Sequence, residues 1–94
     1  MENKLCLITG GGSGIGRATA LKFAENKIDT IIVGRREDAL VETKNLANNN
    51  SQYIKIIKAD ISNEAGINKL YEQIDEKFDN YVNILVNNAG TSSQ

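Results

Sequence analysis

The 94-residue sequence contains no histidine, no proline and no tryptophan, and it has a single cysteine. Without histidine, the chain has no Ser-His-Asp or Cys-His nucleophilic group and none of the usual zinc sites. Because Cys6 is alone, the chain forms no internal disulfide, and we expect it in the reducing cytoplasm. These absences exclude two large classes of catalytic chemistry.

Long hydrophobic runs and an excess of one charge are also absent. The apolar run Leu5–Ile8 is among the longest, and such runs are too short for a signal-peptide core or a membrane span. Eleven basic and twelve acidic residues give a net charge of −1, so we expect no nucleic-acid partner. The acidic residues Asp75, Glu76 and Asp79 follow no metal-binding pattern and indicate a solvated helix face. The sequence therefore predicts neither a membrane contact nor a metal site.

Strand-like and helix-like segments alternate along the whole chain. With 40% hydrophobic residues, the composition is typical of a soluble globular domain. From the apolar and β-branched runs and the helical spacing of apolar residues, we expect strands at 4–9, 30–33, 53–58 and 84–86, and helices at 14–26, 38–48 and after Ser62 as far as Phe78. A turn is expected at 48–51. This order predicts an α/β fold with a parallel sheet that helices cover on both faces.

The last expected helix has the clearest hydrophobic period in the chain. We expect Ser62 to cap its start, with Glu64 in the first turn. One face carries five apolar or aromatic residues: Ile67, Leu70, Tyr71, Ile74 and Phe78. We expect Tyr71 to belong to the core. In the first strand, Cys6 is expected to be a small buried apolar residue.

A glycine-rich stretch, Thr9–Gly16, lies between the first expected strand and the first expected helix. Its spacing is T-G-x-x-x-G-x-G, with Gly10, Gly14 and Gly16 in the fixed places. Glycines at this junction permit a sharp turn and a close approach of the backbone to an anion, and the helix that follows offers unpaired N–H groups to a pyrophosphate. The alternative is a glycine-rich connection without a ligand, but its place in an alternating fold favours dinucleotide binding.

Three motifs together resemble the short-chain dehydrogenase/reductase family. Thr9–Gly16 resembles its cofactor loop, 60–62 resembles its adenine-contacting turn, and 87–90 resembles its N-N-A-G motif. The resemblance implies a Rossmann-like, doubly wound parallel sheet with the strand order 3-2-1-4. It implies that the chain, residues 1–94, is the N-terminal dinucleotide-binding part of one oxidoreductase domain whose catalytic part is absent.

The resemblance also implies roles for individual residues. In the loop, it places a group of residues around the pyrophosphate and ribose: Gly10, Ser13, Gly14, Ile15 and Gly16. After the later strands, it places the remaining contacts at Asp60, Ile61, Asn87, Ala89 and Gly90. Asp60 would accept a hydrogen bond from the adenine amino group, or it would only initiate the turn before Ser62. Asn87 would border the cofactor and also tie the central strands together.

The choice of cofactor is predicted from the end of the second expected strand. An acidic residue there selects NAD, whereas an arginine accommodates the 2′-phosphate of NADP. Here Gly34 ends the strand, and Arg35 and Arg36 follow it. We therefore expect NADP(H) to be preferred, with NAD(H) as the other candidate; the alternative is that both arginines are solvated loop charges.

No catalytic residue is predicted. The family uses a tyrosine with a lysine four residues later, but Ile57, Asp75 and Leu85 stand four residues after the three tyrosines of this chain. The sequence thus predicts an oxidoreductase that transfers hydride to or from a carbonyl or alcohol substrate when complete, as a homo-oligomer, with the 94-residue chain alone inactive. The alternatives are a small non-catalytic dinucleotide-binding or regulatory module and a decayed gene product.

Overall fold

A computed structural model describes residues 4–10, 12, 14–78 and 84–87. Its elements follow in the order β1 (Leu5–Thr9), α1 (Gly14–Glu25), β2 (Asp29–Gly34), α2 (Glu37–Leu46), the 3₁₀-helix η1 (Asn48–Tyr53), β3 (Ile54–Lys58), α3 (Glu64–Phe78) and β4 (Ile84–Asn87). The predicted alternation is confirmed, with bounds that differ by one or two residues. The turn expected at 48–51 is part of η1, where Asn48 takes the left-handed conformation with φ 54°.

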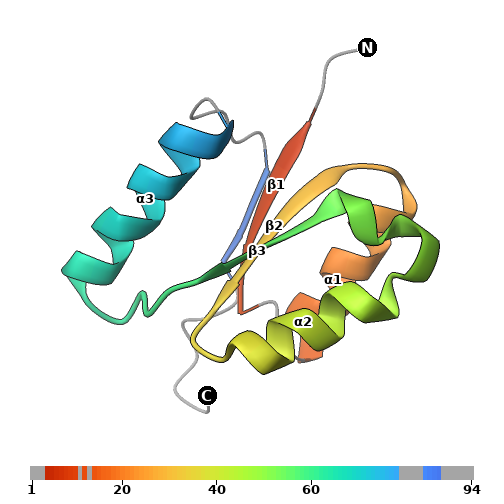
Figure 1. Ribbon diagram of the computed structural model, residues 1–94, viewed down its shortest axis with the longest axis horizontal. Helices are drawn as coiled ribbons and strands as arrows, with labels where there is room; N and C mark the ends of the chain where they lie inside the picture. Colours follow the sequence, from red (N-terminus) through yellow and green to blue (C-terminus); the bar gives the residue numbers. More distant parts are fainter. Residues whose placement is uncertain (1–3, 11, 13, 79–83, 88–94) are drawn as a thin grey trace.

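The four strands form one parallel sheet in the predicted order β3-β2-β1-β4, as Figure 1 shows. Backbone hydrogen bonds continue past the carboxyl ends of the strands. The Gly10 N–H donates to the Val33 carbonyl at 2.8 Å, and the Ala59 N–H donates to the Gly34 carbonyl at 2.9 Å. The segments that leave β1 and β3 are therefore held beside the end of β2.

Helices cover both faces of the sheet, α1 and α2 on one side and α3 on the other (Figure 1). Because successive strand residues point to opposite faces, β1, β2 and β3 each contribute to two hydrophobic clusters. The cluster under α3 consists of Leu5, Leu7, Ile31, Val33, Ile57, Leu70 and Ile74. The cluster under α1 and α2 consists of Cys6, Ile8, Ala20, Ala24, Ile32, Leu40 and Ile54. Cys6 is fully buried, as predicted, and burial raises the pKa of its thiol to about 11.

Two predictions about α3 are wrong. Ser62 does not cap the helix: α3 begins at Glu64, and the side chain of Asn63 accepts a hydrogen bond from the Gly66 N–H at 2.8 Å. Tyr71 is not in the core, since it is 53% exposed. Leu70 and Ile74, four residues apart, fill the face toward the sheet, and Tyr71 lies about 100° around the helix from Leu70.

The end of α1 places a lysine in a conformation that favours glycine. Lys27 has φ 63°. Its N–H donates to the Ala24 carbonyl at 2.9 Å, and the Ile28 N–H donates to the Phe23 carbonyl at 3.0 Å. This is the hydrogen-bond pattern of a Schellman motif, whose left-handed position is usually occupied by glycine.

Replacing Lys27 with glycine is expected to raise the free energy of unfolding by about 0.5–1 kcal/mol. The left-handed conformation costs a non-glycine residue roughly 1–2 kcal/mol, and the greater freedom of glycine in the unfolded chain offsets part of that gain. Equilibrium denaturation measures the change. The matched control is Lys22→Gly on the same helix, which is expected to destabilise by about 1 kcal/mol. A loss of stability in Lys27→Gly would contradict the assigned helix end.

Candidate functional site

The carboxyl ends of the strands meet along one edge of the sheet. In the register of the parallel strands, Thr9 of β1 lies opposite Val33 of β2 and Asn87 of β4, and Gly34 of β2 lies opposite Lys58 of β3. The segments that follow these strands therefore start side by side. In open α/β sheets, ligands bind in the crevice outside this edge.

This arrangement brings together the predicted site residues that the structure describes. Those residues are Gly10, Gly14, Ile15, Gly16, Arg35, Arg36, Asp60, Ile61 and, at the end of β4, Asn87. Ser13, Ala89 and Gly90 lie outside the described residues. The sequence therefore located the strand ends correctly, and the cofactor contacts themselves remain predictions.

The glycine-rich loop needs its glycines at two positions of the backbone. Gly10 has φ 74° and Gly14 has φ 58°, the region that residues with a side chain rarely adopt. A Cβ atom added to Gly14 would meet nothing within 4 Å, so the loop is open on this side. Gly16 is buried, whereas the apolar side chain of Ile15 is 72% exposed. The first turn of α1 contains no acidic residue, so the positive end of the helix dipole is not neutralised there.

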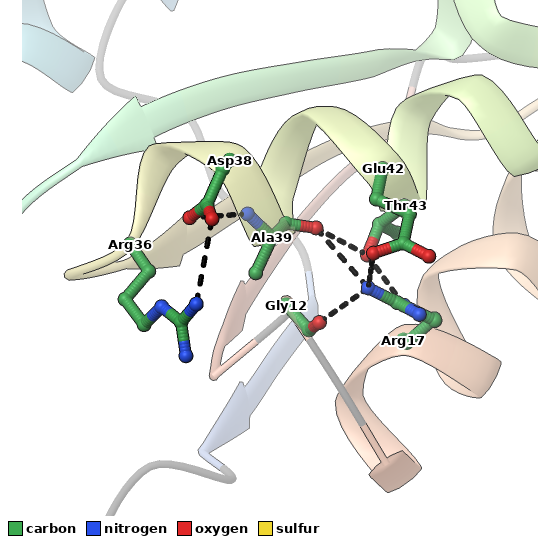
Figure 2. A network of polar contacts seen from close by, with 7 residues as sticks. All are labelled: Gly12, Arg17, Arg36, Asp38, Ala39, Glu42 and Thr43. Atoms are coloured by element: carbon green, nitrogen blue, oxygen red, sulfur yellow. Dashed lines mark hydrogen bonds and ion pairs between the residues drawn. The ribbon is translucent and has the colours of Figure 1, made fainter.

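The two arginines after β2 differ in their contacts. Arg36 forms an exposed ion pair with Asp38 at 3.4 Å (Figure 2). The pKa of Asp38 is lowered, first by the hydrogen bond from the Ala39 N–H and then by Arg36. Arg35 is exposed and forms no hydrogen bond or ion pair with any residue in the described part of the chain. Arg35 is thus the more available cation for an anionic ligand.

Asp60 shapes the turn after β3. Its Oδ1 atom accepts hydrogen bonds from the Ser62 N–H at 3.0 Å and from the Ser62 hydroxyl at 2.6 Å. The Ser62 contacts lower the pKa of the Asp60 carboxyl, and the charge of Arg35 lowers it further. These hydrogen bonds hold the turn before Ser62, and both roles considered for Asp60 are compatible with them; its exposed carboxylate lies within electrostatic reach of Arg35. Ile61 is partly buried against the cluster under α3.

Arg17 is a residue that the sequence reasoning missed. Its Nη2 atom donates to the Gly12 carbonyl at 2.6 Å and to the Ala39 carbonyl at 3.2 Å, and it lies 3.4 Å from Glu42 Oε1. Its Nε atom donates to Thr43 Oγ1 at 2.9 Å (Figure 2). The available signal was a basic residue in the first turn of a helix, where the dipole disfavours a cation.

Neither a metal cluster nor a membrane-spanning helix occurs in the described part of the chain. No group of three or more His, Cys, Asp or Glu residues that could hold a metal ion occurs within 4–10, 12, 14–78 and 84–87. None of the helices in these ranges has the length and hydropathy needed to cross a membrane.

Comparison with known proteins identifies a family. The sequence model described as short chain dehydrogenase matches residues 4–94. An uncharacterized oxidoreductase of Thermotoga maritima is 33% identical over 93 residues, which cover 99% of this chain and 36% of the relative. An NADP-dependent (R)-specific alcohol dehydrogenase of Lentilactobacillus kefiri is 37% identical over 90 residues, which cover 96% of this chain and 35% of the relative.

The fold also matches solved structures. An actinorhodin polyketide ketoreductase, solved with NADPH, has a TM-score of 0.83 and 26% identity, and the match covers 95% of this chain and 34% of that protein. The chain thus spans about a third of the length of these proteins.

Proposed function

We propose that this chain, which belongs to the short-chain dehydrogenase family, forms the NADP(H)-binding part of an oxidoreductase. The family binds nicotinamide dinucleotides, and the preference for NADP(H) is our inference for this chain. The observation that carries it is Arg35, an exposed arginine directly after β2 that forms no hydrogen bond or ion pair with a described residue and whose charge acts on Asp60 only at longer range. The relative from Lentilactobacillus kefiri, described as NADP-dependent, supports the same preference.

The glycine-rich loop and the start of α1 fit a pyrophosphate. The left-handed Gly10 and Gly14 bring the backbone to the strand edge without side chains in the way, and the first turn of α1 presents N–H groups and a positive dipole end. The buried Gly16 lets α1 lie close to the sheet. Ile15, apolar and exposed beside the loop, would cover the ribose.

The segments after β2 and β3 would hold the adenosine half of the cofactor. The guanidinium of Arg35 can grip a 2′-phosphate through two charge-assisted hydrogen bonds. Arg36 would contribute less, because its ion pair with Asp38 must be given up. Asp60 would accept from the adenine amino group while Ser62 keeps its carboxylate in place, and the main chain of Ile61 would contact the ring. Asn87, the last residue of β4, would border the cofactor together with Ala89 and Gly90, which follow it in the sequence.

The cofactor, when bound, supplies hydride chemistry, and this chain supplies binding and orientation. The substrate of the complete enzyme is proposed to be a small carbonyl compound or alcohol. The acid/base pair of the family, Tyr-x-x-x-Lys, does not occur in these 94 residues. Without a group that delivers a proton to the substrate oxygen, carbonyl reduction loses a large contribution to its rate.

We expect the 94-residue chain alone to show no NADPH-dependent reductase activity, and we expect turnover from a longer protein that contains it together with a Tyr-x-x-x-Lys sequence. Loss of NADPH absorbance against a panel of ketones and aldehydes measures both. Turnover by the 94-residue chain would refute the first expectation. If the longer protein binds NADPH but turns over no substrate, the non-catalytic dinucleotide-binding module becomes the better description.

A further inference from the structure

Arg17 joins two segments that lie far apart in the sequence. It belongs to the first turn of α1, yet its guanidinium contacts the glycine-rich loop at Gly12 and the helix α2 at Ala39 and Thr43 (Figure 2). The Nε and Nη2 atoms use different partners, so the planar group is fixed at two points. With 23% of its side chain exposed, Arg17 is partly shielded from water, which strengthens these hydrogen bonds relative to surface ones.

A second, independent contact holds the loop at the same place. A Cβ atom added to Gly12 would lie 2.9 Å from the Cβ atom of Ala39, closer than real side chains approach one another. The backbone at Gly12 therefore lies directly against α2. Buried Leu40, the next residue of α2, packs beneath this contact, with Cδ2 3.8 Å from the same Cβ position.

The charge of Arg17 is poorly placed for the helix that carries it. A cation in the first turn opposes the dipole of α1, and the same helix end would attract a pyrophosphate. The carbonyl oxygens of Gly12 and Ala39 and the carboxylate of Glu42 offset this charge. The guanidinium of Arg17 thus points toward Gly12 and α2 (Figure 2).

We propose that Arg17 is a positioning residue for the glycine-rich loop: it holds the Gly12 carbonyl against α2 so that the loop is fixed at the pyrophosphate site. The inference rests on the proposed function. Arg17 would touch neither the adenosine 2′-phosphate nor the nicotinamide. Replacing Arg17 would therefore weaken the binding of all ligands that contain the pyrophosphate by the same factor.

The test compares Arg17→Met with the unchanged full-length protein in titrations with NADPH, NADH and 2′-AMP. Losing the loop contact is expected to raise the dissociation constants of both dinucleotides about tenfold. The ratio of the NADPH and NADH constants is expected to stay the same, and 2′-AMP, which has no pyrophosphate, is expected to bind unchanged. Lys22→Met is the matched control, because Lys22 is a cation on the same helix whose side chain is 76% exposed. This substitution should alter none of the three dissociation constants.

Two further variants keep the test decisive if Arg17→Met does not fold. Arg17→Lys can still reach the Gly12 carbonyl but cannot reproduce the fork to Thr43, so it should recover part of the dinucleotide affinity. Thr43→Val removes the partner of Nε, together with the Thr43 hydroxyl's own hydrogen bond to the Ala39 carbonyl, but leaves the Nη2 contact with Gly12, and it should give a smaller loss of the same pattern. The proposal is overturned if the affinity for 2′-AMP falls in parallel with the affinity for NADPH. It is also overturned if the dinucleotides bind all the Arg17 and Thr43 variants as tightly as they bind the unchanged protein. If the unchanged protein binds neither dinucleotide, the proposed function itself fails.

Discussion

Replacing Arg35 with alanine is expected to weaken NADPH binding by roughly 10- to 100-fold while leaving NADH binding nearly unchanged. The reason is the exposed guanidinium directly after β2, which forms no hydrogen bond or ion pair with a described residue and would pair with the 2′-phosphate. NADH lacks that phosphate. Dissociation constants for both cofactors, measured by titration of the full-length protein, give the result.

Arg36→Ala is the matched control for Arg35→Ala. The guanidinium of Arg36 is paired with Asp38 at 3.4 Å, so Arg36→Ala should raise the dissociation constant for NADPH less than Arg35→Ala does. The double substitution shows whether the two arginines share the role. If NADPH affinity survives both changes, or if NADH affinity falls in parallel, the assignment of Arg35 is wrong.

Replacing Leu40 with alanine is expected to lower the free energy of unfolding by about 2–5 kcal/mol. Leu40 is fully buried in the cluster under α1 and α2. Its side chain fills the space above Gly34, where an added Cβ atom would lie 3.3 Å from Leu40 Cδ2. Removing it leaves a cavity between α2 and the end of β2, next to the glycine-rich loop. Equilibrium denaturation with urea measures the change.

The same substitution at Leu46 is the control for Leu40→Ala. Leu46 is on the same helix and is 48% exposed, so its truncation is expected to cost less than about 1 kcal/mol. Equal losses at the two positions would mean that Leu40 does not pack as described. Because Leu40 also supports the loop, Leu40→Ala should weaken dinucleotide binding in addition to stability.

The fold could be predicted from the sequence because its signals are local and agree with one another. The β-branched run from Thr30 to Val33 predicts a strand that is buried on both sides, and the structure places it in the interior of the sheet. The strand order required the resemblance to the family, since periodicity does not show which strands are neighbours. The glycine-rich loop was found because Gly10 and Gly14 stand at a strand–helix junction.

The errors and omissions have particular physical causes. Ser62 and Asn63 are both good capping residues, and the one nearer to Glu64 caps α3. Tyr71 lies beside a hydrophobic stripe, and a helical period alone does not give the width of the buried face. Arg17 was missed because its hydrogen-bond partners cannot be identified from the sequence. Thr43 is 26 residues away, and no sequence pattern links Gly12, five residues away, to Arg17, so these contacts are visible only in the folded structure.

The central claim is that the carboxyl edge of this sheet binds NADP(H) through the glycine-rich loop and Arg35. The most direct measurement is the pair of dissociation constants of the full-length protein for NADPH and NADH at one ionic strength. We predict NADPH to bind at least about tenfold more tightly, the value of one charge-assisted contact to the 2′-phosphate. Equal or tighter binding of NADH, or no binding of either cofactor, would contradict the claim.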